Sequence, residues 1–512
     1  MSEEHKRRSW RRKAILGGFL AFLTPIAVLI GCRRTWIRPL AGVRVEMSRP
    51  IVRERDLGPD SAYHLLLLAI EKPVRAALLA GTVPVWREDW TEATAKLRLH
   101  GWPANPPPPA AKPPGGPGLP GAGKRPPIPS PALPWSRDQY EDIQQLVALY
   151  EPQIALLDRA LAAPDPQMLT IDAASLPHPN WEEVLDLARW LAVSAEYRAA
   201  TGDHAGAFRD LGRAVDMGNL LCRGGGTMNH LVAAACQSIA MDSAWQIVAK
   251  LDVPLPVLRQ ASCHTLLAAD SVEPVVEALR ADALRVPGRV ANGDRTTVLS
   301  LFPMYGFGGS PPGRMVQSFL VAILPITGST RQTTTRNLGC LYQHGIALAQ
   351  TPYSAKTKAA YGALAPSPTG QREMRSIMLW TRDPVGYLCA SALANSFGGT
   401  HRRATRRDAM LRGTALFLAL RAYEVEHGRV PERLEQLVPE SLPHIPDDPF
   451  DGMPFRYLRS SVPGLPPAAW AVYSVGDDFT DDGGTVKAVG GSPGASGPDF
   501  VWPSQPYPDG GH

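Results

Sequence analysis

Nineteen consecutive residues near the N-terminus, AILGGFLAFLTPIAVLIGC (14–32), carry no charge, and they constrain the chain more than any other feature. As a helix, this run is about 28 Å long, close to the roughly 30 Å hydrocarbon core of a bilayer. Six Lys and Arg precede it within residues 1–13, whereas three arginines follow within 33–38. This bias predicts a basic cytoplasmic tail at 1–13 and a transmembrane anchor at 14–32.

The end of the run allows a second interpretation. LIGC at 29–32 resembles the lipobox of bacterial lipoproteins, which would make Cys32 a lipidation site. Two arginines directly after the cysteine are unusual for lipoproteins, and the run is long for a signal-peptide core. An uncleaved single-pass anchor is therefore favoured. Both interpretations place residues 33–512 in the periplasm, on the outer surface of a bacterial inner membrane.

The net charge of +5 is a local property of the N-terminus. Residues 1–38 hold nine Lys and Arg and two Glu, so the remaining chain is slightly acidic. Because no basic face remains for a phosphate backbone, we expect no nucleic-acid partner.

A proline-rich segment divides the chain. Between Pro103 and Pro134, 14 of 32 residues are proline, with few apolar side chains that could be buried. Such a composition predicts an extended or disordered linker. GLPGAGK at 118–124 lies inside it, but Arg125 stands where a phosphate-binding loop needs Ser or Thr, and no strand precedes it.

Residues 181–221 predict an antiparallel helix pair that turns at Gly202–Asp203. The second half of the pair is similar to the tetratricopeptide-repeat signature, with Ala207, Leu211 and Ala214 at the matching positions. The resemblance implies helical layers that cover one another's apolar faces. Weaker helical patterns follow at 335–362 and 384–396.

The C-terminal residues predict a small α+β module. A long helix has its apolar stripe at Leu411, Ala415, Leu418, Ala422 and Val425, and His427–Gly428 supplies its C-cap. A turn at 451–452 and two apolar runs predict an antiparallel hairpin. The expected fold is therefore mainly α, with an N-terminal transmembrane helix, an extracytoplasmic repeat-like helical region and a small α+β module. We expect these parts: tail 1–13, anchor 14–32, membrane-proximal helical segment 33–102, linker 103–134, helical repeat-like domain 135–399, α+β module 400–502 and tail 503–512.

Three motifs follow one another in this module: AYEVEHGRVPERLEQL, DPFDGMPFRY and YSVGDDFTDDGG. Together they resemble the C-terminal globular part of the major pseudopilin of bacterial type II secretion systems, over about residues 405–484. The N-terminus lacks a prepilin-peptidase site, so we do not expect a processed fibre subunit. The whole chain also resembles uncharacterised bacterial envelope proteins that combine an anchor, a helical region and such a module.

The pseudopilin resemblance implies a structural calcium ion in the acidic loop at 473–484. Asp478 fits the family's S-x-G-x-D motif, Asp481 and Asp482 fit its later acidic pair, and Asp477 is a further candidate ligand. Calcium takes six to eight oxygen ligands, which flexible Asp/Gly loops supply. The alternative is an acidic turn that keeps the edge of a sheet in water.

The sequence shows no motif that predicts catalysis. Nucleophile elbow, zinc-ligand spacing and dinucleotide loop are all absent, and the six cysteines form no C-x-x-C pair. His230 and His264 lie in helical stretches and are expected to be packing or partly exposed residues. We therefore expect a non-enzymatic membrane-anchored scaffold or binding protein with an unidentified protein partner. The alternatives are an accessory component of a type II secretion or pilus-like machine, and an envelope hydrolase with an unrecognised site.

Overall fold

A computed structural model provides the fold of the chain. The predicted tail 1–13, anchor 14–32 with Cys32, and linker 103–134 lie outside the residues that the structure describes. The described residues are 37–43, 45–48, 50–53, 57–70, 137–168, 180–291, 331–364, 383–460, 462–463, 465–466, 469–485 and 499–505.

The chain divides into two compact units, and each has its own buried residues. Unit 1 contains residues 1–46, 282–350 and 358–398, and unit 2 contains 47–281, 351–357 and 399–512. Unit 2 therefore includes most of the predicted helical domain as well as the C-terminal module. Its helices and its sheet contribute to one hydrophobic core.

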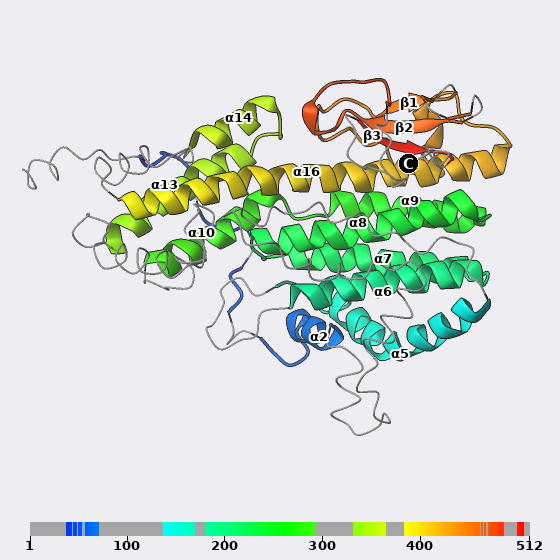
Figure 1. The fold of residues 1–512 in the computed structure, drawn as a ribbon, viewed down its shortest axis with the longest axis horizontal. Helices are drawn as coiled ribbons and strands as arrows, with labels where there is room; N and C mark the ends of the chain where they lie inside the picture. The colour runs from blue at the N-terminus through cyan, green and yellow to red at the C-terminus, as the bar shows by residue number, and fades with distance from the viewer. Residues whose placement is uncertain are drawn as a thin grey trace, which may run out of the picture. The chain divides into compact units, whose positions relative to one another are not determined.

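Unit 2 is built mainly from helices, as predicted, and α6, α7, α8 and α9 lie side by side (Figure 1). Its helices up to the unit boundary are α2 (Ala62–Ala69), α5 (Arg137–Leu161), α6 (Trp181–Ala200), α7 (His204–Cys222), α8 (Thr227–Lys250), α9 (Leu255–Asp270) and the first part of α10 (Val275–Ala291).

The predicted turn between α6 and α7 is confirmed. Asp203 caps α7, because its side chain accepts a hydrogen bond from the backbone N–H of Gly206 at 2.8 Å. Gly202 has φ +92°, a conformation that glycine adopts without strain. The turn is therefore fixed by its own sequence, which explains why it could be predicted.

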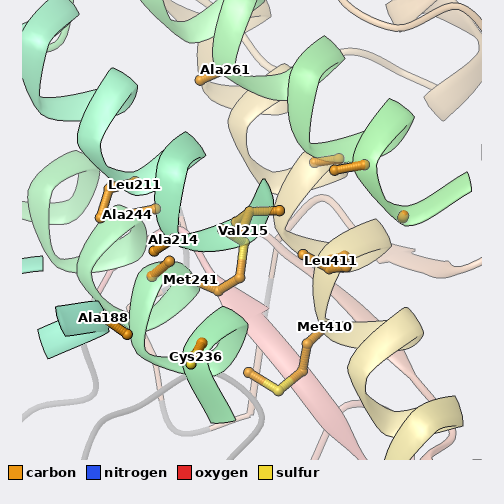
Figure 2. Packing of buried hydrophobic residues seen from close by; sticks show 14 of the residues in the cluster. Ala188, Leu211, Ala214, Val215, Cys236, Met241, Ala244, Ala261, Met410 and Leu411 are labelled. Atoms are coloured by element: carbon orange, nitrogen blue, oxygen red, sulfur yellow. The ribbon is translucent and has the colours of Figure 1, made fainter. Parts of the chain in front are cut away.

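Small residues let these helices approach closely. Figure 2 shows the short side chains of Ala188, Ala214 and Ala244 between α6, α7 and α8. Gly218 of α7 lies against the side chain of Gln237 of α8, where a Cβ would come within 2.7 Å. Gln237 Nε2 donates to the carbonyl of Val215, so this contact is both packed and hydrogen-bonded.

Helix α8 is long and apolar enough to cross a membrane by length and composition. Thirteen of its residues between Asn229 and Val248 are buried, its remaining side is mostly half-buried, and it packs against α6 and α7. Among the described helices it alone meets this test, and its burial is that of a core helix.

Helix α16 (Pro384–His427) begins sixteen residues before the predicted module boundary at Thr400. Its residues from 399 onward carry the core of unit 2, and His427–Gly428 ends it as predicted, with Gly428 at φ +64°. The predicted apolar stripe is buried at Leu411, Ala415, Leu418 and Ala422. Val425 is an exception, because its side chain is 57% exposed.

A three-stranded antiparallel sheet follows, in the order β1 (Arg456–Leu458), β2 (Ala471–Ser474) and β3 (Phe500–Pro503). The hairpin of β1 and β2 was predicted, and Tyr457 lies opposite Val472. Strand β3 was not predicted. It packs on α16, where the indole of Trp502 lies against Gly413 and its Nε1 donates to Thr414 Oγ1 at 3.1 Å.

Unit 1 contains the last residues of α10, α13 (Arg331–Ala349), most of α14 (Ala355–Leu364) and residues 384–398 of α16. Asp383 is fully buried at the start of α16. Its carboxylate accepts hydrogen bonds from Thr334 Oγ1, Asn337 Nδ2 and the backbone N–H of Gly386. This cap ties α13 to α16 within the unit.

Candidate functional site

The acidic loop follows β2 as a tight backbone turn. A short 3-10 helix, η4 (Gly476–Asp478), is followed by Phe479 in the left-handed region at φ +64°. Gly483 and Gly484 have φ +69° and +73°, a conformation that glycine adopts without strain, so the backbone turns sharply here.

The loop does not gather its four predicted calcium ligands around one point. Asp477 forms an ion pair with Arg402 of α16 at 3.3 Å. Asp478 Oδ1 accepts a hydrogen bond from the backbone N–H of Thr480 at 3.0 Å.

The two later aspartates also have different surroundings. Asp481 Oδ1 accepts hydrogen bonds from Tyr473 Oη and the backbone N–H of Gly483, and its Oδ2 faces Arg456. The Gly483 N–H is the main reason that the pKa of Asp481 is lowered. Asp482 takes part in the hydrogen bonding of the loop mainly through its backbone, because its carbonyl accepts a hydrogen bond from Thr485 Oγ1 at 2.7 Å.

Two buried aspartates that were not predicted hold the loop in place. Asp499 Oδ2 accepts from the backbone N–H of Gly484 at 2.8 Å, and Asp448 Oδ2 accepts from that of Val475 at 3.0 Å. Burial raises the pKa of both carboxyl groups. The sequence signal for Asp448 is its place at the start of DPFDG, whereas Asp499 stands alone after a Gly/Ser-rich run.

This arrangement does not fit the calcium site that the pseudopilin resemblance implies. In the described part of the chain, no group of three or more His, Cys, Asp or Glu could hold a metal ion. Both oxygens of Asp481 are engaged by protein donors, and Asp477 is paired with an arginine. Calcium binding at 477–482 therefore stays a prediction from the resemblance, without support from the loop's geometry.

The three motifs of the C-terminal module are joined by hydrogen bonds. Tyr457 Oη donates to the carbonyl of Pro431 at 3.2 Å, which links the second motif to the first. Asp448 links the second motif to the third through Val475. The motifs therefore fold as one structural unit on α16.

A separate feature of unit 2 is a cavity of about 410 Å³ among the helices. Its apolar lining comes from Phe208, Leu211, Met241, Val257 and Leu418, on α7, α8, α9 and α16. Leu211 and Met241 are labelled in Figure 2. We call this cavity the groove; its volume lies in the range of ligand-binding sites, about 300–1,000 Å³.

Charged pairs surround the groove. Arg213 contacts Asp158 of α5 through two nitrogens, at 2.7 and 2.6 Å, and it also contacts Asp210. His264 of α9 lies 3.2 Å from Asp216 of α7, and the hydrogen bond to Asp216 raises the pKa of its imidazole. The groove is therefore lined both by the charged residues of these pairs and by apolar side chains.

A smaller cavity of about 230 Å³ shares Asp158, Arg209 and Arg213 with the groove. Arg209 lines both cavities and is exposed. The pKa of Asp203 is lowered mainly by the hydrogen bond from the backbone N–H of Gly206, and the charge of Arg209 adds to this effect. The two cavities therefore form adjoining parts of one surface on α5 and α7.

A buried polar cluster lies elsewhere in unit 2. Arg407 of α16 donates to Asp408 Oδ1 through Nε and Nη2, and to Cys222 Sγ through Nη1 at 3.3 Å. Burial raises the pKa of Cys222 to about 11 and lowers that of His230 to about 3. At neutral pH the thiol is therefore protonated and the imidazole neutral, so the cluster holds neither a thiolate nor an imidazolium.

Comparisons with known proteins give no relative for this chain. No family model matches it, and no curated protein or solved structure is significantly similar.

Proposed function

We propose that this chain is a membrane-anchored, extracytoplasmic binding protein without enzymatic activity, whose groove holds a segment of a protein partner. The observation that carries the proposal is the cavity of about 410 Å³ among α5, α7, α8, α9 and α16.

The lining of the groove suits a peptide segment. The half-buried Phe208 and Val257 offer apolar contacts to side chains, whereas the exposed Arg209 and Gln260 offer hydrogen-bond donors to carbonyl groups. Layers of paired helices commonly use such surfaces for binding. The ion pairs of Arg213 keep the groove's shape fixed before a partner arrives, which reduces the entropic cost of binding.

The sequence of residues 1–38 supports the cellular location. An uncharged run of nineteen residues behind six Lys and Arg favours insertion with the N-terminus in the cytoplasm. In this proposal the groove faces the periplasm, and its partner is a periplasmic or membrane protein.

Co-purification from detergent-solubilised membranes tests the proposal. Ala205 is exposed and lines the groove, so Ala205→Trp should cover it without disturbing the core. Leu267→Trp is the matched control, because Leu267 of α9 is 54% exposed and is not among the lining residues. The partner should be lost with Ala205→Trp and retained with Leu267→Trp; equal recovery with both variants would contradict the proposal.

A second candidate function is an accessory component of a type II secretion or pilus-like machine. The hydrogen bonds of Tyr457 and Asp448 favour it, because they join the three pseudopilin-like motifs into one module. If this function is the right one, secretion-system subunits should co-purify with the chain and persist in the Ala205→Trp variant. Recovery of a partner unrelated to secretion would argue against it.

A further inference from the structure

Arg456 of β1 extends its guanidinium group into the acidic loop. Each of the three nitrogens faces a different carboxylate. Nη2 lies 2.6 Å from Asp451 Oδ2, Nε lies 3.3 Å from Asp481 Oδ2, and Nη1 lies 3.7 Å from Asp448 Oδ2. The arginine side chain is 23% exposed, so these charges interact more strongly than they would in bulk water.

The three carboxylates come from two separate segments. Asp448 and Asp451 belong to the turn before β1, and Asp481 belongs to the loop after β2. Without a cation between them, their mutual repulsion would drive the two segments apart. A central positive charge is therefore needed for this arrangement.

We infer that Arg456 is a built-in cation that takes the place of a calcium ion, so that the C-terminal module keeps its structure without a divalent metal. A guanidinium group suits this role because its planar fork offers five N–H donors and its charge is permanent. Arg456 faces Oδ2 of Asp481, and Tyr473 Oη and the backbone N–H of Gly483 donate to Oδ1. Both carboxylate oxygens of Asp481 are therefore already engaged, which leaves little room for a metal. The inference concerns the acidic loop alone and is independent of the groove.

Thermal unfolding of the full-length chain in detergent, in EDTA and in millimolar calcium, tests the inference. We expect the wild-type protein to have the same Tm in both. Arg456→Gln should lower the Tm in EDTA by about 2–4 °C, because charged hydrogen bonds are lost and three carboxylates are left without their cation. Calcium should recover part of that loss, because the cluster is then open to another cation.

Arg459→Gln is the matched control. Arg459 is exposed and lies three residues further along the chain. The Arg459→Gln substitution removes the same charge as Arg456→Gln but leaves the contacts of the three carboxylates intact. The Tm of this variant should therefore equal that of the wild type in both buffers. A double variant, Arg456→Gln with Asp481→Asn, removes one repelling charge and should be more stable than Arg456→Gln alone.

Four results would overturn the inference. They are a calcium-induced rise in the Tm of the wild type, an Arg456→Gln variant as stable as Arg459→Gln, an Arg456→Gln variant that gains nothing from calcium, and a double variant no more stable than the single one. The double variant covers the case in which Arg456→Gln fails to fold.

Discussion

Asp448 and Val475 are joined by a hydrogen bond of 3.0 Å, although 27 residues separate them in the sequence. The buried carboxylate of Asp448 also accepts from the backbone N–H of Phe450 at 3.0 Å. One side chain therefore fixes both the turn before β1 and the end of β2. Its position explains how the acidic loop is held against the sheet.

Asp448→Asn should destabilise the protein by about 1–3 kcal/mol. The asparagine keeps one acceptor oxygen, but its amide NH₂ group cannot accept the hydrogen bond from Val475. Urea unfolding of the full-length chain measures the effect. Asp447→Asn is the control, because Asp447 is its exposed neighbour and should show little change. Equal stability of the two variants would show that the Val475 hydrogen bond is unimportant.

Gly413→Ala should destabilise the protein by about 1–3 kcal/mol, since a Cβ there would lie 2.4 Å from the ring of Trp502. In the same helix, a Cβ added at Gly399 would have the Nη1 atom of the flexible Arg403 side chain as its nearest neighbour, at 3.4 Å. Gly399→Ala should instead stabilise α16 by about 0.5–1 kcal/mol. Denaturant unfolding of both variants checks the opposite signs, and destabilisation of similar size in both would refute the close contact.

Asp242→Asn should raise the Tm at pH 7.5 and have no effect at pH 4. Burial raises the pKa of Asp242 from its ordinary value of 3.8 to about 7, although Arg406 opposes the shift. The unfolded chain therefore ionises first as the pH rises, and the wild type loses stability between about pH 4 and pH 7. The asparagine is neutral throughout, so the difference in Tm should grow over this window. A constant difference from pH 4 to pH 7.5 would contradict the shift.

The rate of thiol labelling should differ between the buried and the partly exposed cysteines of the described chain. Burial raises the pKa of Cys236 and Cys389 to about 12, whereas Cys263 is partly exposed. In a Cys32→Ser background at pH 8, N-ethylmaleimide should modify Cys263 at least about 100-fold faster than the buried thiols. Mass spectrometry of the native protein and of a Cys263→Ser control measures this, and rapid labelling of Cys236 would show that α8 is not a core helix.

Features set by neighbouring residues could be predicted from the sequence. The turn at Gly202–Asp203 depends on a glycine and a capping aspartate, and both act within a few residues. The end of α16 at Gly428 is of the same kind, whereas the pairing of β1 and β2 followed from two apolar runs separated by twelve residues. The mainly helical fold with a small antiparallel sheet followed from such local signals.

Features set by distant residues could not be predicted. Strand β3 has only four residues and includes Pro503, a residue type that is rare inside strands. The predicted module boundary at Thr400 falls inside α16, which continues from Pro384 to His427. Val425 has the helical spacing of the core, but no other part of the described chain covers it.

The acidic loop shows the same limit for the candidate site. Its aspartates were visible in the sequence, but Arg456 lies 25 residues from Asp481, and no spacing rule connects them. The groove likewise combines residues from five helices, among them Asp158 and Leu418. Only the folded chain brings these groups together.

Photo-crosslinking in living cells most directly tests the proposed binding role of the groove. A photoreactive p-benzoylphenylalanine replaces Ala205 at the groove or Leu267 on the exposed face of α9 in the full-length chain. We expect a discrete adduct with a periplasmic or membrane protein from position 205 and none from position 267. No adduct from position 205, or the same adduct from both positions, would contradict the groove as the binding site.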